Sequence, residues 1–579
     1  LVRFCVMKHG THLFWQILLV LFVVLLALLC ATEWTAWSLG WSPRFGEPLF
    51  VILDMPVYVP WAFFGWWYSF DAYAPDVFER GGMIAGSGGI AAIVIAVTGS
   101  ILRARGDKRV STFGSARWAE SKDLRKSGLL KPAGVFLGQT EGAYLRHDGP
   151  DHVMAFAPTR SGKGVGLVVP TLLSWPHSVL VHDIKGENWQ LTSGWRSEFS
   201  HCVRFDPTDI VSAHFNPLME VRRGLNEARD VQNIVDILVD PRGVVEEPGH
   251  WVDKAKSLLT GAILHVLYAE PEKTLARVGT FLADPDRTFR TTIEIMKRTN
   301  HLGTNEAPRV HPIVATKARE MSNQTENELS GVLSTALRFL ALYADPVIAE
   351  VTSRSDFRID DLVSGDRPLS LYLVVPPSDL SRTKPLMRLI LNQVGRRLTE
   401  HLDVSPFKVS RSISIVANTL RACGLLAPQV SVAAPKTRRR VLFMLDEFPA
   451  LGKLDFFESA LAYMAGYGLK AFLIAQSLNQ IEKAYGPSNA ILDNCHVRVA
   501  FATNDERTAK RISDALGTKT EQRAMKNYAG HRLAPWLSHK MVSRQETARQ
   551  LLTPGEVMQL PSDQELVLVA GSPPVRALK

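Results

Sequence analysis

Two long uncharged runs stand in the first part of the chain, at residues 13–31 and 81–102, and no comparable run follows them. Each run is long enough to cross a bilayer as an α-helix. Positive residues precede the first run and follow the second, which places both outer ends on the cytoplasmic side. We therefore predict a membrane anchor over residues 1–107, with two transmembrane helices and a periplasmic loop over residues 32–80.

Residues 49–70 form a third stretch that is almost uniformly apolar and rich in tryptophan. Asp54, Pro56 and Pro60 interrupt this stretch, and a third crossing would break the distribution of positive charge. The preferred interpretation is a segment that packs at the membrane interface or against a partner.

After residue 108, short apolar runs end in polar turns and alternate with stretches of helical spacing. This order is typical of an open, parallel α/β sheet. We predict one α/β domain in two parts, residues 108–224 and 356–579, interrupted by an all-helical insert over residues 225–355. The predicted strands are residues 153–156, 178–182, 202–205, 369–375, 441–445, 471–475, 497–502 and, as the last, 566–570.

Three further stretches lie within the second part of this domain. Residues 385–401 are predicted to form a helix. Residues 404–437 show no clear period and are predicted to be a long loop or an atypical insertion. Residues 519–549 are basic and are predicted to be loop-like, either along a path for nucleic acid or as a solvated face.

Charge and cysteine content narrow the class of protein only slightly. The 579 residues include 66 Lys plus Arg against 57 Asp plus Glu, a formal net charge of +9. This excess of positive charge is compatible with nucleic acid or an anionic membrane as partner. Because the charge is spread over a long chain, it does not distinguish between these two partners. The five cysteines are scattered without paired spacing, which argues against a disulfide framework or zinc site and for a reducing compartment.

The strand at residues 153–156 leads into a loop punctuated by proline and glycine, and an apolar helix start follows. In a phosphate-binding loop, backbone N–H groups hold phosphate oxygens and a lysine reaches the β- and γ-phosphates. Against the pattern G-x-x-x-x-G-K-[ST], Ala157 replaces the first glycine and Gly164 replaces the metal-binding hydroxyl, so a turn that binds nothing stays an alternative. The candidate phosphate-binding residues are Thr159, Arg160, Ser161, Gly162, Lys163, Gly164 and Val165.

An acidic pair follows a later apolar strand. Residues 441–445 are uniformly apolar and end at Asp446 and Glu447. A Mg²⁺–nucleotide site requires one carboxylate for the water shell of the metal and another to polarise the attacking water. An ordinary strand with an acidic turn would give the same pattern, but together with Lys163 the pair predicts hydrolysis of a Mg²⁺-bound nucleotide.

The strand at residues 471–475 ends at Gln476. An amide at this position of a nucleotide-hydrolysing sheet senses the γ-phosphate or orients water, and a surface glutamine is an equally good interpretation of the spacing.

With these residues in view, the chain resembles the TraG-type coupling proteins of conjugative type IV secretion systems. Beside the phosphate loop, the matching stretches are residues 113–119 (FGSARWA), 183–187 (DIKGE), 445–452 (LDEFPALG), 475–477 (AQS) and 492–495 (LDNC). Several matches in the same order over nearly the whole chain indicate a family far more specifically than one phosphate-binding loop does.

The resemblance implies a RecA-like P-loop NTPase at the bacterial inner membrane, with a helical insert subdomain and two N-terminal transmembrane helices. It also implies DNA-stimulated ATP hydrolysis in which Lys163, Glu447 and Gln476 are catalytic and Asp446 carries Mg²⁺ largely through water. The implied partners are a relaxase with its single-stranded DNA, the inner-membrane components of the secretion channel, and further copies in a homo-hexamer.

Two features depart from this family. Residues 404–437 look longer than the usual link into the acidic strand. The arginine that some relatives place before the glutamine strand has no clear match, which leaves Lys470, Arg498 and Arg507 as candidates for a residue that reaches a neighbour's nucleotide.

Other functions stay open at this point. One is a member of the same family that exports proteins only, and another is a docking scaffold that binds ATP without turning it over, against which the pair Asp446 and Glu447 argues. A chromosome-segregation translocase is also conceivable, but it usually carries more than two membrane spans.

Overall fold

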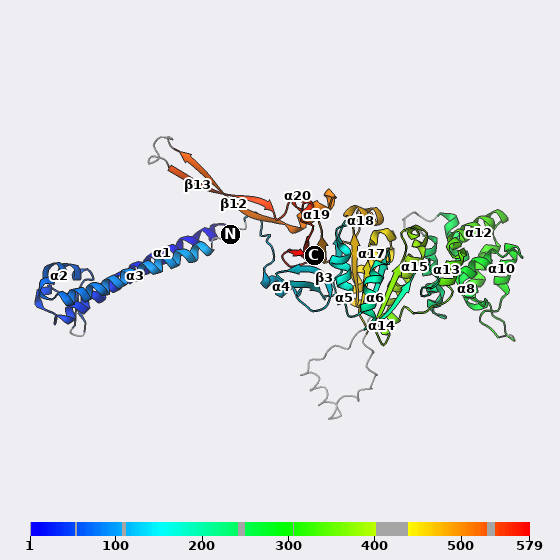
Figure 1. Ribbon diagram of the computed structural model, residues 1–579, viewed down its shortest axis with the longest axis horizontal. Helices are drawn as coiled ribbons and strands as arrows, with labels where there is room; N and C mark the ends of the chain where they lie inside the picture. Colours follow the sequence, from blue (N-terminus) through cyan, green and yellow to red (C-terminus); the bar gives the residue numbers. More distant parts are fainter. Residues whose placement is uncertain are drawn as a thin grey trace, which may run out of the picture. The chain divides into compact units, whose positions relative to one another are not determined.

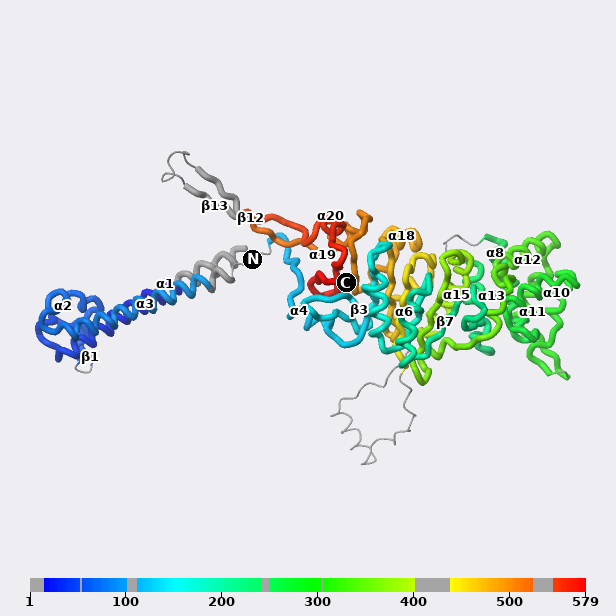
Figure 2. Tube along the Cα trace, viewed as in Figure 1, coloured from blue at the N-terminus to red at the C-terminus, as the bar shows by residue number. Residues whose placement is uncertain are grey.

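The computed structural model describes residues 2–52, 55–106, 112–240, 249–304, 306–400, 438–529 and 539–579 (Figures 1 and 2). The chain divides into two compact units, Leu1–Thr112 and Phe113–Lys579. The predicted atypical insertion at residues 404–437 lies outside the described residues.

Two long helices dominate the first unit: α1 (Val2–Ser38) and α3 (Pro75–Gly106). Within the described residues they contain two stretches that are long and apolar enough to cross a membrane, Trp15–Ser38 and Pro75–Ile101. A Cβ atom on Gly88 of α3 would lie 2.0 Å from the Cβ atom of Ala27 on α1, so the two helices approach where only glycine fits. The prediction of two apolar helices is confirmed, and both extend beyond their predicted ends.

Residues 32–80 are not simply a loop, because α1 continues to Ser38 and α3 begins at Pro75. Between them lie a small hairpin, β1 (Phe50–Ile52) and β2 (Met55–Val57), the helix α2 (Ala62–Phe70) and two 3₁₀ turns, η1 (Pro43–Phe45) and η2 (Asp71–Tyr73). The buried residues of this segment and the helices beside it form a small core: Ala31, Ala36, Phe45, Tyr58, Phe63, Trp66 and Phe78. The tryptophan-rich segment therefore packs in part on its own unit.

The second unit is built on a sheet in which eleven described strands follow the order β4-β3-β15-β14-β11-β5-β10-β9-β6-β8-β7. From β11 to β7 all neighbours are parallel, and from β11 to β4 they are antiparallel. The strands are β3 (Val135–Thr140), β4 (Ala143–His147), β5 (Val153–Phe156), β6 (Ser178–Asp183), β7 (His201–Phe205), β8 (Leu369–Val374), β9 (Val441–Leu445), β10 (Leu469–Ala475), β11 (Val497–Ala500), β14 (Gln564–Val569) and β15 (Val575–Leu578).

Successive side chains of the central strands enter two different cores. On β9, Phe443 and Leu445 belong to one hydrophobic cluster, whereas Leu442 and Met444 belong to a second. Helices therefore cover both faces, which explains why these strands are continuous apolar runs in the sequence. The covering helices include α4 (Ser121–Ser127), α5 (Val169–Ser174), α6 (Glu187–Ser197), α14 (Asp361–Ser364), α15 (Leu380–Leu398), α17 (Asp455–Met464), α18 (Leu478–Tyr485), α19 (Glu506–Leu516) and α20 (Pro554–Met558).

A run of helices lies between β7 and β8, and its α8 is buried along most of its length. Its apolar residues belong to the same cluster as one face of the sheet. The helices are α7 (Glu227–Val239), α8 (His250–Ala269), α9 (Leu275–Leu282), α10 (Phe289–Arg298), α11 (Pro312–Ser322), α12 (Glu326–Leu340) and α13 (Pro346–Val351). The division of the chain into domains at residues 108–224, 225–355 and 356–579 stays a prediction.

The basic stretch at residues 519–549 was wrongly predicted to be loop-like. Its described parts form a long hairpin, β12 (Thr518–Ala529) and β13 (His539–Gln550). Polar residues stand on both faces of these strands, so the sequence shows no alternation of apolar and polar positions from which a strand could be predicted.

Two smaller predictions were also wrong. The last strand is β15, not the predicted strand at residues 566–570, because the short Val575–Leu578 adds an antiparallel edge beside β14. The helix predicted to start at Pro385 begins at Leu380, and Pro385 stands inside it.

A buried carboxyl group lies in the antiparallel part of the sheet. Glu565 on β14 is fully buried, and neither of its carboxyl oxygens has a hydrogen-bond partner among the described residues. Gly138 on β3 makes room for it, since a Cβ atom there would lie 1.9 Å from Glu565 Oε1. Burial raises the pKa of Glu565 to about 9.

The substitution Glu565→Gln should change how stability depends on pH. Below the unfolded pKa the carboxyl is protonated in both states, whereas at higher pH only the unfolded chain releases the proton. The parent therefore loses up to about 1.4 kcal/mol per pH unit as the pH rises toward the folded pKa. We expect the melting temperature of Glu565→Gln to exceed that of the parent by several degrees at pH ~8 and to converge with it at pH ~5. The exposed Glu272→Gln serves as control, and an equal difference at both pH values would contradict this account.

Candidate functional site

The predicted site residues meet at the carboxyl ends of three adjacent parallel strands. The strand β10 lies between β5 and β9, and the register pairs Ala475 with Phe156 and Leu473 with Leu445. The loop after β5, Gln476 after β10 and the acidic pair after β9 therefore emerge at one edge of the sheet. Ligand sites of open α/β sheets form at such an edge.

The loop after β5 has an unusual backbone. Arg160 and Gly162 both have positive φ, +62° and +82°, and Gly164–Val168 (η3) forms a π-helical turn that passes into α5. Positive φ is disfavoured at a non-glycine residue such as Arg160, and strain of this kind clusters at ligand sites. Arg160 is thus held in a conformation that it does not favour, whereas Gly162 adopts positive φ without strain.

Lys163 lies between the two carboxylates that follow β9. Its Nζ is 2.7 Å from Asp446 Oδ1 and 3.2 Å from Glu447 Oε1. Burial alone would lower the pKa of Lys163, but the two neighbouring carboxylates outweigh it, and the pKa is raised. The predicted meeting of this lysine with the acidic pair is confirmed.

Gln476 completes the group. Its Nε2 donates a hydrogen bond of 2.9 Å to Glu447 Oε1, the same oxygen that Lys163 contacts. Glu447 itself has a left-handed backbone, φ +57°, which is strained for a glutamate. One carboxylate is therefore held by a cation and an amide from two neighbouring strands.

The donor set fits a magnesium–nucleotide pair. Mg²⁺ is usually bound through one or two carboxylates and the phosphates of its substrate, with water in the other positions. The carboxylate of Asp446 lies beside the phosphate loop, and Ser161 Oγ is a buried oxygen without a hydrogen-bond partner among the described residues. No group of three or more His, Cys, Asp or Glu that could hold a metal is found in the described residues.

Sequence reasoning missed a histidine beneath the acidic pair. His182, at the end of β6, is fully buried, and its Nδ1 lies 3.1 Å from the carbonyl oxygen of Asp446. Burial lowers the pKa of His182 and so favours the neutral ring. The one signal in the sequence is an imidazole directly after the apolar run of residues 179–181.

A lysine far along the chain also touches the phosphate loop. Lys579 Nζ donates a hydrogen bond of 2.9 Å to the carbonyl oxygen of Ser161 and lies 3.9 Å from the ring centre of Phe501. No pattern in the sequence connects residue 579 with this loop, so only the fold shows the contact.

The three candidates for a residue that reaches a neighbour's nucleotide differ in their surroundings. The candidate Lys470 is excluded, because its side chain is buried and donates hydrogen bonds to the carbonyl oxygens of His147 and Gly149. Burial lowers the pKa of Lys470 to about 7. Arg498 donates to carbonyl oxygens nearby in its own chain, and the exposed Arg507 pairs with Glu482.

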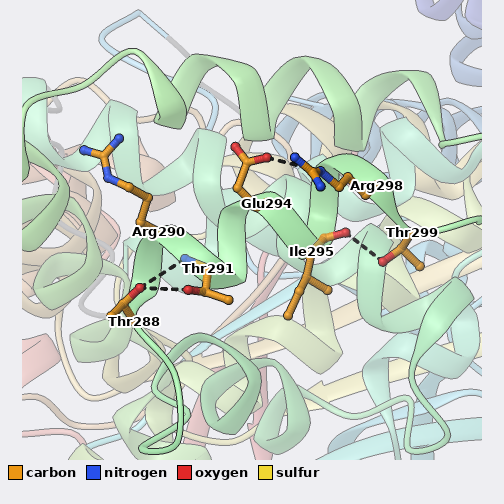
Figure 3. A pocket seen from close by; sticks show the side chains of 7 residues that line it. All are labelled: Thr288, Arg290, Thr291, Glu294, Ile295, Arg298 and Thr299. Carbon is orange, nitrogen blue, oxygen red and sulfur yellow. Dashed lines mark hydrogen bonds and ion pairs between the residues drawn. The ribbon is translucent and has the colours of Figure 1, made fainter.

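A separate open depression of about 640 Å³ lies on α10 (Figure 3). Its charged side chains are paired: Arg298 with Glu294 inside the depression, and Arg290 with Glu326 of α12. None of the sequence-predicted site residues lines this depression, so it is separate from the site at the carboxyl ends of the strands. The lining residues are Thr288, Arg290, Thr291, Glu294, Ile295, Arg298 and Thr299.

The chain matches the protein family described as "Type IV secretory system Conjugative DNA transfer" over residues 117–406 and 424–579. Two curated relatives show the extent of the similarity. The conjugal transfer protein TraG of Escherichia coli is 39% identical over 541 residues, which are 87% of this chain and 80% of TraG. The protein VirD4 of Agrobacterium fabrum (strain C58 / ATCC 33970) is 30% identical over 536 residues, 89% of this chain and 72% of VirD4.

Solved structures of the plasmid coupling protein TrwB have the same fold. The TrwB complex with ADP and Mg²⁺ aligns with a TM-score of 0.54 at 17% identity, over 80% of this chain and 93% of TrwB. The complex with a non-hydrolysable ATP analogue aligns with a TM-score of 0.51 at 18% identity, over 80% and 92%. At this identity the likeness shows the fold alone, and it confirms the predicted P-loop NTPase fold.

Proposed function

The chain belongs to the coupling-protein family of conjugative DNA transfer, and from this membership we propose a membrane-anchored ATPase that brings relaxase-bound DNA to a type IV secretion channel. The observation that carries the ATPase part is the contact of Lys163 with Asp446 and Glu447. A cation from the phosphate loop beside two carboxylates is the arrangement that hydrolysis of a Mg²⁺-bound triphosphate needs. TrwB has been solved with ADP and Mg²⁺, which supports the same ligands here.

Each site residue has a distinct role in this proposal. The backbone N–H groups of residues 159–165 bind phosphate oxygens, and Lys163 leaves its carboxylate partners for the β- and γ-phosphates. Mg²⁺, when bound with ATP, neutralises charge on the phosphates. Asp446 orients the water shell of the metal, Glu447 polarises the attacking water, and Gln476 holds Glu447 in the orientation seen here.

The membrane and the partners follow from other parts of the chain. The apolar helices α1 and α3 anchor the protein in the bacterial inner membrane in this proposal, with the second unit in the cytoplasm. The partners are a relaxase with single-stranded DNA, the inner-membrane proteins of the channel, and further copies of the chain in a homo-hexamer. Export of proteins alone is not favoured, because the matched family is one of DNA transfer.

The substitution Glu447→Gln should separate binding from hydrolysis. Without a carboxylate to polarise water, we expect the rate of ATP hydrolysis by the full chain to fall about 100-fold or more, while Mg²⁺–ATP still binds. Lys163→Ala should lose binding as well. The exposed substitutions Lys122→Ala and Glu198→Gln are controls. ATP hydrolysis that persists in Lys163→Ala would contradict the assignment of Lys163 to the site. Absence of hydrolysis in the unsubstituted protein would favour a scaffold that only binds ATP.

Single-stranded DNA should bind mainly through its phosphates and stimulate hydrolysis. We expect affinity to fall steeply between about 50 mM and about 200 mM salt and to change little with base sequence. Anisotropy of a labelled oligonucleotide and ATP turnover measure the two effects in the same sample. A chain that hydrolyses ATP but neither binds DNA nor responds to it would favour the protein-export function.

A further inference from the structure

The end of β15 lies at the same edge of the sheet as the phosphate loop. The strand β15 is antiparallel to β14, and β14 is antiparallel to β11, which is parallel to β5. Because two reversals restore the direction, β15 and β5 run the same way. Lys579, which follows Leu578 at the end of β15, therefore emerges at the edge where the loop after β5 begins.

The side chain of Lys579 is fixed both at its base and at its charged end. A Cβ atom added to the buried Gly166 would lie 3.4 Å from the Cβ atom of Lys579, so the lysine packs on the backbone of the phosphate loop. The ammonium group lies 3.9 Å from the ring centre of Phe501, a favourable contact between a cation and an aromatic ring. Phe501 is in turn tied to β5, because its N donates a hydrogen bond of 3.0 Å to Phe156 O.

Two carbonyl oxygens accept hydrogen bonds from this ammonium group. Lys579 Nζ donates to Ser161 O at 2.9 Å and to Ser562 O at 2.6 Å. Ser161 belongs to the phosphate loop, and Ser562 lies in the turn before β14. Hydrogen bonds from a charged donor are stronger than those between neutral groups. Lys579 therefore ties the phosphate loop to the antiparallel part of the sheet.

The bond to Ser161 O sets the orientation of the peptide group between Ser161 and Gly162. This peptide is trans, so its C=O and N–H lie in one plane and point in opposite directions. A lysine that holds the C=O toward β15 directs the N–H of Gly162 away from β15. In the sheet, β15 and β9 stand on opposite sides of β5, and Lys163 reaches toward the carboxylates that follow β9. The N–H of Gly162 is thus turned toward the side on which Lys163 acts.

Ser161 also lies between the two residues of the loop that have positive φ, Arg160 and Gly162. A strained backbone such as that of Arg160 persists only where the surrounding structure maintains it. The bond from Lys579 is a contact from outside the loop, made at the residue directly after Arg160. It therefore helps to maintain the shape in which successive N–H groups of the loop form a cradle for an anion.

We propose that Lys579 is a positioning residue for the nucleotide, which sets the Ser161–Gly162 peptide before the phosphates arrive. The inference rests on the proposed binding of Mg²⁺–ATP at this loop. A loop that already has its bound shape loses less freedom when the ligand binds, and its affinity is higher. Because Lys579 acts through Ser161 and not on the reacting atoms, it should affect nucleotide affinity and leave the chemical step unchanged.

The substitution K579M tests this role in the full chain, since methionine has a similar length and no donor. Binding of a non-hydrolysable ATP analogue with Mg²⁺ gives Kd, and ATP hydrolysis gives KM and kcat. We expect Kd and KM to rise about tenfold, the size of effect expected from loss of a hydrogen bond to a charged group. The value of kcat should stay within about twofold of the parent, as for a contact made equally before and during the reaction.

Two further variants control for charge and for folding. K579R keeps a charged donor at this position and should bring Kd back to within about threefold of the parent, although the guanidinium has a different shape. R576Q removes one positive charge from an exposed position of the same strand, where Arg576 donates to Gln564, and should bind the nucleotide as the parent does. If K579M does not fold, K579Q takes its place and should lose affinity in the same sense.

Hydrogen exchange without nucleotide keeps this inference separate from the proposed function. In K579M the amides of residues 157–166 should exchange faster than in the parent, while those of β9 and β10 keep their protection. Equal loop exchange and equal Kd in K579M and parent would overturn the role of Lys579. An equal loss of affinity in R576Q, or a fall in kcat at constant KM, would also overturn it. A parent that binds no Mg²⁺–ATP would instead contradict the proposed function.

Discussion

One electrostatic contact organises the second unit: the ammonium group of Lys163 between the carboxylates of Asp446 and Glu447. Lys163 follows β5, and the two carboxylates follow β9. These two strands are far apart in the sequence, but in the sheet only β10 lies between them. Two adjacent carboxylates at the partly buried edge of a sheet repel each other, and a cation at 2.7–3.2 Å offsets this repulsion. A triphosphate with its metal would take over both halves of the contact, because it brings negative charge to the lysine and positive charge to the carboxylates.

The surrounding fold holds this contact in place at a cost in backbone energy. Arg160 and Glu447 both have positive φ, which costs about 1–3 kcal/mol at each such residue. The cores on either side of the parallel sheet provide the stability that maintains such strain, and His182 supports the acidic turn from inside the sheet. Of the four non-glycine residues with positive φ among the described residues, Arg160 and Glu447 lie at this site, whereas Trp41 and Glu141 lie elsewhere.

Much of this site could be predicted because buried parallel strands are uniform apolar runs, and a polar residue after such a run stands out. That pattern located Lys163, Asp446 and Gln476 on the correct strands and placed them at one edge. It failed for the β12–β13 hairpin, whose faces are both polar, and for the short strand β15, which is too brief to show a period. The contact of Lys579 with the phosphate loop depends on how β15 lies in the sheet, which no local pattern encodes.

A double-mutant cycle on nucleotide affinity tests most directly whether Lys163 and Asp446 face the same triphosphate. Affinity for Mg²⁺–ATP is measured for Lys163→Met, Asp446→Asn and the double variant of the full chain. If both residues act on one ligand, the two losses are not additive, and the coupling between them exceeds about 0.5 kcal/mol. Losses that simply add, as expected of residues that serve separate sites, would contradict the account.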